Sequence, residues 1–265
     1  MKNTPTPNSR RGQRGFTLVE LLVVISIIVV LASIATPTVL RAMKHAERVE
    51  ALANLRSIKG GLDLFAADFS GELPNDSTAE QLANLLRDDE LDSPRRSRLE
   101  GSSNLQINQL SGKSRSSEVQ RTSNDYLQQL MGRGLDNEKL LHNNAFRSTF
   151  RLQRPNNDGV VDEGENVWGY TRNLFRTSSG HIPVVYDAPV STGESPRFSK
   201  KTWDGRILVA KMDGSTTSIP ISGSDRRNGP VRETIRGQNI NLFSQEALEE
   251  GEIVPANLKR IGSDQ

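Results

Sequence analysis

A long apolar run near the amino terminus is the feature that most limits what this chain can fold into. Residues 16–40 contain 18 apolar residues out of 25, and only two serines interrupt the stretch 21–35. A helix of this length crosses roughly 30 Å of hydrocarbon. A helix is required there because lipid offers no hydrogen-bond partners to free backbone groups. The sequence therefore predicts a transmembrane helix over residues 16–40.

The basic charge of the chain is concentrated before this run. The whole sequence has 34 Lys and Arg against 32 Asp and Glu, a formal charge of +2. Residues 1–15 hold four basic residues and no acid, which leaves 30 basic against 32 acidic residues, a charge of −2, for the rest. Basic residues on one flank favour keeping that flank in the cytoplasm. We therefore expect a single-pass membrane protein with a cytoplasmic amino terminus.

Composition excludes several functional classes. The sequence has no cysteine, so it forms no disulfide, thiolate metal site or cysteine nucleophile. A net charge near zero argues against a nucleic-acid-binding surface over the whole chain. The three histidines, His45, His142 and His181, are scattered, and no GxSxG, HExxH, phosphate-loop or dinucleotide motif occurs. We therefore expect a protein that is not an enzyme.

Two residues are unusual for a simple membrane anchor. Glu20 lies near the start of the apolar run, where an unpaired carboxylate in lipid costs roughly 3 kcal/mol. Pro37 lies near its end, where it removes a helical hydrogen bond. Taken alone, Glu20 would sit at the headgroups and Pro37 would end the span. A secretory signal peptide cleaved after Ala35 is an alternative for the segment, but it leaves Glu20 without a role.

The run Arg14-Gly15-Phe16-Thr17-Leu18-Val19-Glu20 resembles the processing signal of type IV prepilins and of type II secretion pseudopilins. In that family a membrane peptidase cuts after the glycine and methylates the new amino terminus. The resemblance implies cleavage between Gly15 and Phe16 and N-methylation of Phe16. Glu20 and Pro37 then become residues 5 and 22 of the mature chain, the spacing that the family shows. The resemblance extends to about Phe69, a fifth of the chain.

The resemblance also implies a function and a set of partners. The chain would be a structural subunit, a pseudopilin or minor pilin, of a type II secretion or type IV pilus-like filament. Its partners would be the prepilin peptidase, other pilin-like subunits, the inner-membrane assembly platform and the lipid bilayer, with no small-molecule substrate and no required cofactor. The chain would be anchored in the inner (cytoplasmic) membrane, and its head would be periplasmic, or extracellular after assembly. Glu20 would pair with the methylated amine of Phe16 on a neighbouring subunit, and Pro37 would let the helix loosen locally.

An amphipathic pattern continues the apolar run. After Arg41, apolar residues recur at steps of three and four on one helical face: Met43, Ala46, Val49, Leu52, Leu55, Ile58, Leu62, Phe65 and Phe69. One helix is therefore expected from Phe16 to about Phe69, and the run Gly71-Glu72-Leu73-Pro74 ends it. The opposite face of the later half carries charged residues, Lys59 among them, and is expected to face the solvent. The apolar face of that half needs a globular head to cover it.

The remaining sequence predicts a small, loop-rich head. A capping box over residues 77–80 opens a short helix to about Arg87, and two more short helices are expected at 124–131 and 135–142. Strands are predicted at 160–161, 167–170, 181–186, 206–212 and 215–221, with a hairpin turn at Asp213-Gly214 between the last two. A short helix is expected near 244–250. The fold class is α+β: a long amino-terminal transmembrane-plus-spine helix with a small antiparallel β head, as in pilin-like proteins.

These patterns divide the chain into six parts. They are a cleaved basic leader (1–15), a transmembrane helix (16–40), the extramembrane half of the spine helix (41–70), a helical variable region (71–150) with a Ser/Arg-rich insertion at 92–122, a β-rich head (151–225) and a polar carboxyl-terminal tail (226–265).

An acidic loop is a candidate calcium site. Oxygen ligands at alternate positions with a glycine for the turn suit Ca²⁺. Aligned on an EF-hand or dockerin-like loop, the ligands are Asn156, Asp158, the carbonyl of Val160, Asp162 and Glu165. The first ligand position holds Arg154 where such loops need an acid. A plain acidic turn between strands is therefore the alternative.

A basic cluster lies in the insertion. Arg95, Arg96 and Arg98 would contact DNA or an acidic partner, but no aromatic residues are interleaved with them, and a solvated charged loop is the alternative. A second hypothesis for the whole chain follows. If the anchor never assembles, the chain is a membrane-anchored extracytoplasmic binding protein that binds DNA through this loop.

Overall fold

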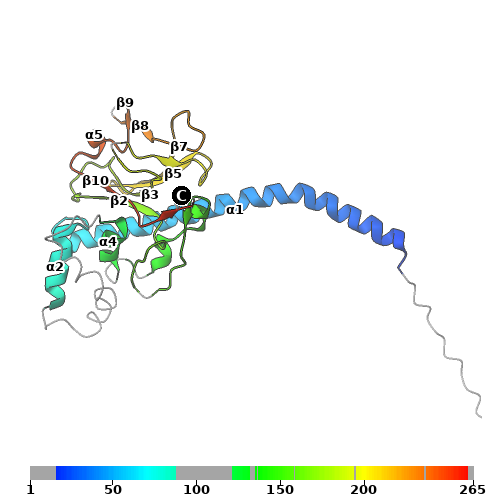
Figure 1. Cartoon of the computed structure of the whole chain (residues 1–265), viewed down its shortest axis with the longest axis horizontal. Helices are drawn as coiled ribbons and strands as arrows, with labels where there is room; N and C mark the ends of the chain where they lie inside the picture. Colours follow the sequence, from blue (N-terminus) through cyan, green and yellow to red (C-terminus); the bar gives the residue numbers. More distant parts are fainter. Residues whose placement is uncertain are drawn as a thin grey trace, which may run out of the picture. The chain divides into compact units, whose positions relative to one another are not determined.

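The computed structural model describes residues 16–82 in full, the backbone of 83–87, and residues 121–131, 135, 137–157, 159–193, 195–235 and 237–261 (Figure 1). The chain divides into two compact units, Met1–His45 and Ala46–Gln265. The second unit is referred to below as the head. It contains the sheet and the later half of the long helix.

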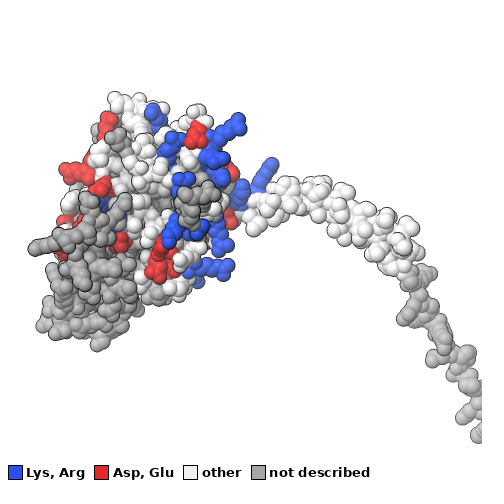
Figure 2. Space-filling model, viewed as in Figure 1, with Lys and Arg blue, Asp and Glu red and all other residues white. Residues whose placement is uncertain are grey.

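Helix α1, Leu18–Asp68, confirms the predicted long helix. In the first unit its large apolar side chains are all exposed, from 45% for Val24 to 81% for Leu18, and Figure 2 shows mostly uncharged side chains along this part. Among the described helices, α1 alone is long and apolar enough to cross a membrane. Its apolar surface therefore needs a covering that the described part of this chain does not supply.

The carboxyl end of α1 lies where the sequence predicts it. The Gly71 N–H donates to the carbonyl oxygen of Ala66 at 2.7 Å, and Ser70 and Gly71 have φ values of 54° and 91°. A left-handed backbone is favourable for glycine because it has no Cβ. Gly71 thus closes the helix and turns the chain back into the head.

The head covers α1 over a shorter stretch than the predicted stripe. The buried residues of the helix are Ala51, Leu55, Ile58, Lys59, Gly61, Leu62, Phe65 and Ala66. Met43 and Val49 are 56% and 51% exposed, so the stripe was predicted to begin too early. Lys59, expected on the solvent face, is only 4% exposed, and its ammonium contacts Asp63 at 2.6 Å.

The head is built on a five-stranded antiparallel sheet in the order β10-β2-β3-β5-β6. Its strands are β2 (Trp168–Arg172), β3 (Pro183–Asp187), β5 (Arg206–Lys211), β6 (Thr216–Pro220) and β10 (Glu252–Val254). The predicted hairpin between β5 and β6 is confirmed: Gly214 has φ 83°, and the Lys211 N–H donates to Ser215 O at 2.9 Å. The prediction of a polar tail over residues 226–265 is wrong in part, because this segment supplies the edge strand β10.

The sheet is buried on both faces. Along β5, Leu208 and Ala210 lie in the core that contains the buried half of α1, while Ile207 and Val209 lie in a second core on the other face. This alternation follows from the two-residue period of a strand. A Cβ at Gly169 would come within 2.5 Å of the Tyr186 ring, so only glycine fits beneath that ring.

Short elements complete the head. The two-stranded ladders are β1 (Phe150–Arg151) with β11 (Lys259–Arg260), β4 (Phe198–Ser199) with β7 (Asn228–Gly229), and β8 (Arg232–Ile235) with β9 (Gln238–Asn241). The helices are α2 (Asp76–Arg87), α4 (Ser123–Leu127), α5 (Gln245–Leu248) and the 3-10 turns η1 (Gln128–Leu130), η2 (Glu138–Leu141) and η3 (Asn144–Ser148).

Three local predictions are corrected by these elements. The helix expected at 135–142 is only the single turn η2, and residues 160–161 are not a strand. The capping box of α2 lies two residues earlier than predicted. The Thr78 N–H donates to Asn75 Oδ1, and the Asn75 N–H donates to Thr78 Oγ1, both at 2.9 Å.

The burial of α1 predicts the cost of truncating its apolar face. Leu55 is fully buried, whereas Leu64 on the same helix is 61% exposed. We expect Leu55→Ala to lower the free energy of unfolding of the full chain by about 3 kcal/mol. The matched control Leu64→Ala should change it by less than about 0.5 kcal/mol. Urea unfolding in detergent, followed by tryptophan fluorescence, measures both values, and equal values would contradict the packing described here.

Candidate functional site

The amino terminus of α1 is closed by a reciprocal cap between Thr17 and Glu20. The Glu20 N–H donates to Thr17 Oγ1 at 3.2 Å. The Thr17 N–H and hydroxyl both donate to Glu20 Oε2 at 2.8 Å. This is a capping box, and it also places a negative charge at the positive end of the helix dipole.

The cap gives Glu20 a partner within its own chain. The carboxylate needs no second subunit to be hydrogen-bonded, which lowers the cost of carrying it at the edge of an apolar segment. Sequence analysis missed this contact, although Thr-x-x-Glu is a readable capping pattern. Gly15 lies outside the described residues, and Phe16 is 77% exposed beside the cap.

Pro37 lies inside α1 and does not end it, because the helix continues to Asp68. The four hydroxyl side chains between residues 21 and 40 each donate to a carbonyl three or four residues earlier, at 2.6–2.8 Å. These bonds satisfy the polar side chains within the helix, as a lipid environment requires. The segment around Pro37 is therefore a continuous apolar helix that lacks one backbone donor.

The candidate calcium loop is held by side chains from three neighbouring elements. The carboxylate of Glu138, which is 3% exposed, accepts hydrogen bonds from the backbone N–H groups of Asn157 and Gly159. The Gln128 amide donates to Gly159 O and accepts from the Val161 N–H, both at 2.6 Å. Asn124 Nδ2 donates to Asp162 O at 2.8 Å. The fold thus fixes this loop with an anion and two amides.

The structure describes all of the candidate calcium ligands except one. Asp158 lies outside the described residues. Glu165 is 3% exposed and accepts a hydrogen bond from the Asp162 N–H at 3.0 Å, so its carboxylate takes part in the turn itself. Among the described residues, no three His, Cys, Asp or Glu side chains come together as a metal site. Calcium binding stays a prediction.

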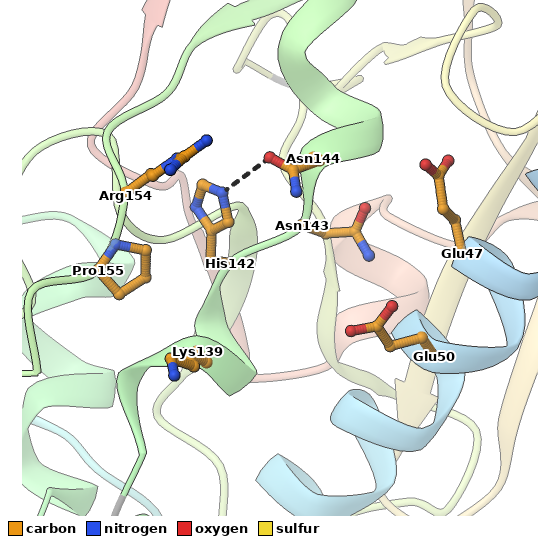
Figure 3. Close-up of a pocket in the computed structure, with 8 residues that line it drawn as sticks. All are labelled: Glu47, Glu50, Lys139, His142, Asn143, Asn144, Arg154 and Pro155. Atoms are coloured by element: carbon orange, nitrogen blue, oxygen red, sulfur yellow. Dashed lines mark hydrogen bonds between the residues drawn. The ribbon is translucent and has the colours of Figure 1, made fainter.

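A cavity of about 400 Å³ lies between the part of α1 that carries Glu47 and Glu50 and the segment 139–155 (Figure 3). Its lining residues are Glu47, Glu50, Lys139, His142, Asn143, Asn144, Arg154 and Pro155. In Figure 3 the two carboxylates project from α1, and His142 and Arg154 lie across from them. Burial lowers the pKa of His142, and the charges of Arg147 and Arg154 act in the same direction, against a hydrogen bond to Asn144. The cavity presents both signs of charge, and its lining supplies no hydroxyl nucleophile.

An ion-pair network surrounds Asp76 at the start of α2. Asp76 at the start of α2 pairs with Arg121 and Arg172, and its Oδ1 accepts a hydrogen bond from the Tyr126 hydroxyl at 2.9 Å. Burial, assisted by the charge of Asp76, raises the pKa of Tyr126 to about 12. The network holds residue 121 beside the first turn of α2. The three basic candidates Arg95, Arg96 and Arg98 lie outside the described residues.

Calcium binding at the loop has a direct test. If the loop binds Ca²⁺, millimolar CaCl₂ should raise the melting temperature of the full chain in detergent by several degrees, because an ion that binds only the folded state stabilises it. Asp162→Asn removes one carboxylate ligand and should abolish the increase. Asp204→Asn, in an exposed loop outside the candidate site, is the matched control. An unchanged melting temperature in the parent chain contradicts the prediction.

Comparisons with known proteins place the resemblance in the amino-terminal segment. Residues 10–36 match the family described as the prokaryotic N-terminal methylation motif. The chain is 41% identical over 58 residues to type II secretion system core protein G of Klebsiella pneumoniae, covering 22% of this chain and 41% of that protein. It is 36% identical over 59 residues to the protein of the same name in Pseudomonas aeruginosa, covering 22% and 42%.

These matches cover a limited part of each protein. The chain spans about two fifths of the length of the curated relatives it matches. No solved structure matches it significantly. The methylation motif and the relatives confirm the resemblance that Arg14–Glu20 predicts: the amino-terminal segment of the chain is similar to that of type IV pilin-like proteins of the pseudopilin kind. In this chain the segment is joined to an antiparallel β head.

Proposed function

We propose that the chain is a structural subunit, a pseudopilin or minor pilin, of a type II secretion or type IV pilus-like filament. The observation that carries this proposal is the methylation motif at residues 10–36, placed at the start of a helix whose apolar side chains are exposed. Such a surface is stable only when lipid or other apolar helices cover it. Lipid covers it before assembly, and the helices of neighbouring subunits cover it in the filament.

Processing prepares the segment for assembly. The prepilin peptidase cuts between Gly15 and Phe16 and methylates the new amine of Phe16. Cleavage removes four basic residues, so the mature subunit loses the charges that hold its amino terminus in the cytoplasm. The subunit is anchored in the inner membrane, and its head lies in the periplasm or, after assembly, outside the cell.

Assembly exchanges the partner of Glu20. In the single chain, Glu20 accepts hydrogen bonds from Thr17. In the filament, the positive amine of a neighbouring Phe16 takes this position. A charge pair in an apolar helix bundle is strong when its geometry is correct and costly when one partner is missing. The exchange therefore favours one axial stagger between subunits.

The mature amino terminus tests processing. We expect mass spectrometry of the protein from cells with a prepilin peptidase to show N-methyl-Phe16 as the first residue. Gly15→Leu should leave the full leader in place, because the peptidase reads the small residue before the cut. An intact leader in the parent chain, or a start at Thr36, would contradict the proposal and would support an anchored binding protein or a secreted one.

Three substitutions separate charge pairing from helix capping. Glu20→Ala removes both the charge and the cap, Glu20→Gln keeps a capping acceptor but removes the charge, and Thr17→Ala removes the cap side chain but keeps the charge. We expect all three variants to be cleaved at Gly15. Filament yield, measured by shearing and sedimentation, should fall at least about tenfold for both Glu20 variants, since the lost ion pair is worth about 1.4 kcal/mol or more per contact.

Thr17→Ala serves as the control for these measurements, and its filaments should form at nearly the parent yield. The opposite pattern, in which Glu20→Gln assembles and Thr17→Ala does not, would show that the cap alone is required. Charge pairing with a neighbouring amine would then be wrong.

A further inference from the structure

Basic side chains gather at one end of the head. Three loop segments at this end, 142–149, 197–206 and 221–229, are here named the basic rim. They contain seven basic residues against two acidic ones. The basic residues are Arg147, Arg197, Lys200, Lys201, Arg206, Arg226 and Arg227, and the acids are Asp204 and Asp225. Figure 2 shows this gathering of Lys and Arg on the head, with Asp and Glu more frequent toward its other end.

Contacts with α1 fix where the rim lies within the head. The guanidinium of Arg48 donates to the carbonyl oxygen of Trp203 at 3.2 Å. The ring of Trp203 contacts that of Phe146, with centroids 5.9 Å apart. Arg48 is in the first turn of α1 that belongs to the head, which begins at Ala46. The rim segments that contain Phe146 and Trp203 therefore lie at the end of the head where α1 enters it.

The rim loops are tied to one another, so that they form one surface. Lys200 Nζ donates to the carbonyl oxygens of Gly223 and Asp225 at 2.7 and 2.8 Å, and Arg197 pairs with Asp225 at 2.9 Å. Arg147, Lys201 and Arg226 are exposed. The charges of these three side chains therefore face the solvent. Arg197 and Lys200 hold the loops that carry two of them together.

The opposite end of the head is rich in acids, two of which, Asp76 and Glu252, pair with Arg172. Residues 68–76, where α1 ends, contain three acids and no basic residue, and residues 244–252 contain four acids and no basic residue. The two segments are joined through the loop that follows β2: the Leu73 N–H donates to Leu174 O at 3.1 Å, and the Ser179 hydroxyl donates to Glu249. The head therefore has a charge asymmetry along the buried half of α1.

Connectivity keeps the rim close to the proposed membrane anchor. Residues 41–45 are helical, so roughly 9 Å of helix axis separates Leu40 from Ala46. The Debye length at physiological ionic strength is about 8 Å. Ala46, where the head begins, is therefore about one screening length of helix axis from the end of the apolar segment. Arg41 and Lys44 add two basic residues in between, and the acids Glu47 and Glu50 follow them in the first turns of the head.

We propose that the basic rim docks on anionic lipid headgroups of the membrane that holds residues 16–40. The inference rests on the membrane anchoring in the proposed function. Basic side chains near an anionic lipid surface are attracted within a Debye length, and the acidic far end is repelled. The single subunit would thus hold its head against the membrane before assembly, and extraction into a filament would break these contacts.

The rim fits lipid better than single-stranded nucleic acid. Single-stranded nucleic acid is bound by exposed aromatic side chains that stack on bases, whereas the rim aromatics Phe146, Phe198 and Trp203 are 2%, 1% and 2% exposed. The rim charges also lie on three loops around one end of the head, which suits a planar layer of headgroups. A lipid surface is therefore the favoured partner.

Hydrogen exchange of the full chain in nanodiscs tests the proposal. The chain is reconstituted in discs of phosphatidylcholine alone and in discs that also contain about one third phosphatidylglycerol. We expect amide exchange in residues 197–206 and 221–229 to be at least about threefold slower in the anionic discs. Residues 68–76 and 244–252 serve as the internal control and should exchange at equal rates. Salt at about 0.5 M should remove the difference.

A charge-matched pair of variants completes the test. Lys201→Glu with Arg226→Glu should abolish the lipid-dependent slowing, while Arg56→Glu with Arg176→Glu, an equal change of charge at exposed positions outside the rim, should retain it. If the chain co-elutes with both kinds of disc and its rim amides exchange at equal rates in both, the docking inference is wrong and anchoring is unaffected. A chain that does not enter discs overturns both. Slowing of the same segments by double-stranded DNA, without slowing by anionic discs, would assign the rim to nucleic acid and overturn the proposal.

Discussion

One helix with two different surroundings is the constraint on which this structure depends. Helix α1 is continuous from Leu18 to Asp68, yet its first half buries none of its large apolar side chains, while its second half supplies the centre of the head core. The change occurs between Leu40 and Ala51, where charged residues replace aliphatic ones. The head can fold only around the second half, and the first half can be stable only in lipid or among other helices.

This constraint explains how a sequence with 34% hydrophobic residues makes an ordered head. Buried polar side chains fill the space that apolar side chains leave between α1, the sheet and the loops. Asn166 donates to Ser123 Oγ at 2.9 Å and to Asn124 Oδ1 at 3.1 Å, and Ser123 in turn donates to Trp168 O at 2.6 Å. Because these groups are hydrogen-bonded to one another, their burial costs little. Directional bonds then specify loop positions that a small apolar core would leave open.

The parts of the fold that sequence analysis predicted are those with a local signal. The long helix, its glycine stop and the Asp213-Gly214 hairpin each follow from periodicity or turn chemistry. Strand β10 was missed because Glu252–Val254 has three residues and no alternating pattern. It exists because its backbone pairs with Arg172–Tyr170, some 80 residues away. Lys59 was placed on the wrong face for a similar reason, since only the tertiary structure shows that the head covers its stem.

The candidate sites also differ in whether their signal is local in the sequence or depends on tertiary contacts. The methylation motif is contiguous, so its residues could be identified from the sequence alone, and the family match at residues 10–36 spans them. The cap of Glu20 is local and could have been predicted from Thr17. The capping of the 156–165 loop by Glu138 could not, because that carboxylate lies on η2 and reaches the loop only in the folded head.

The hydrogen bonds of the carboxylates in this protein show that a conspicuous acid is not by itself evidence for a bound cation. Each of the two acids that the sequence makes conspicuous, Glu20 in the apolar run and Glu165 in the acidic loop, accepts a backbone N–H of its own segment. Glu138 does the same for the neighbouring turn. A cation at either place would have to compete with these hydrogen bonds. It binds only where its interaction with the carboxylate is stronger than the hydrogen bonds it replaces. A charged amine in an apolar helix bundle meets that condition, because the low dielectric there strengthens a charge pair much more than a neutral hydrogen bond.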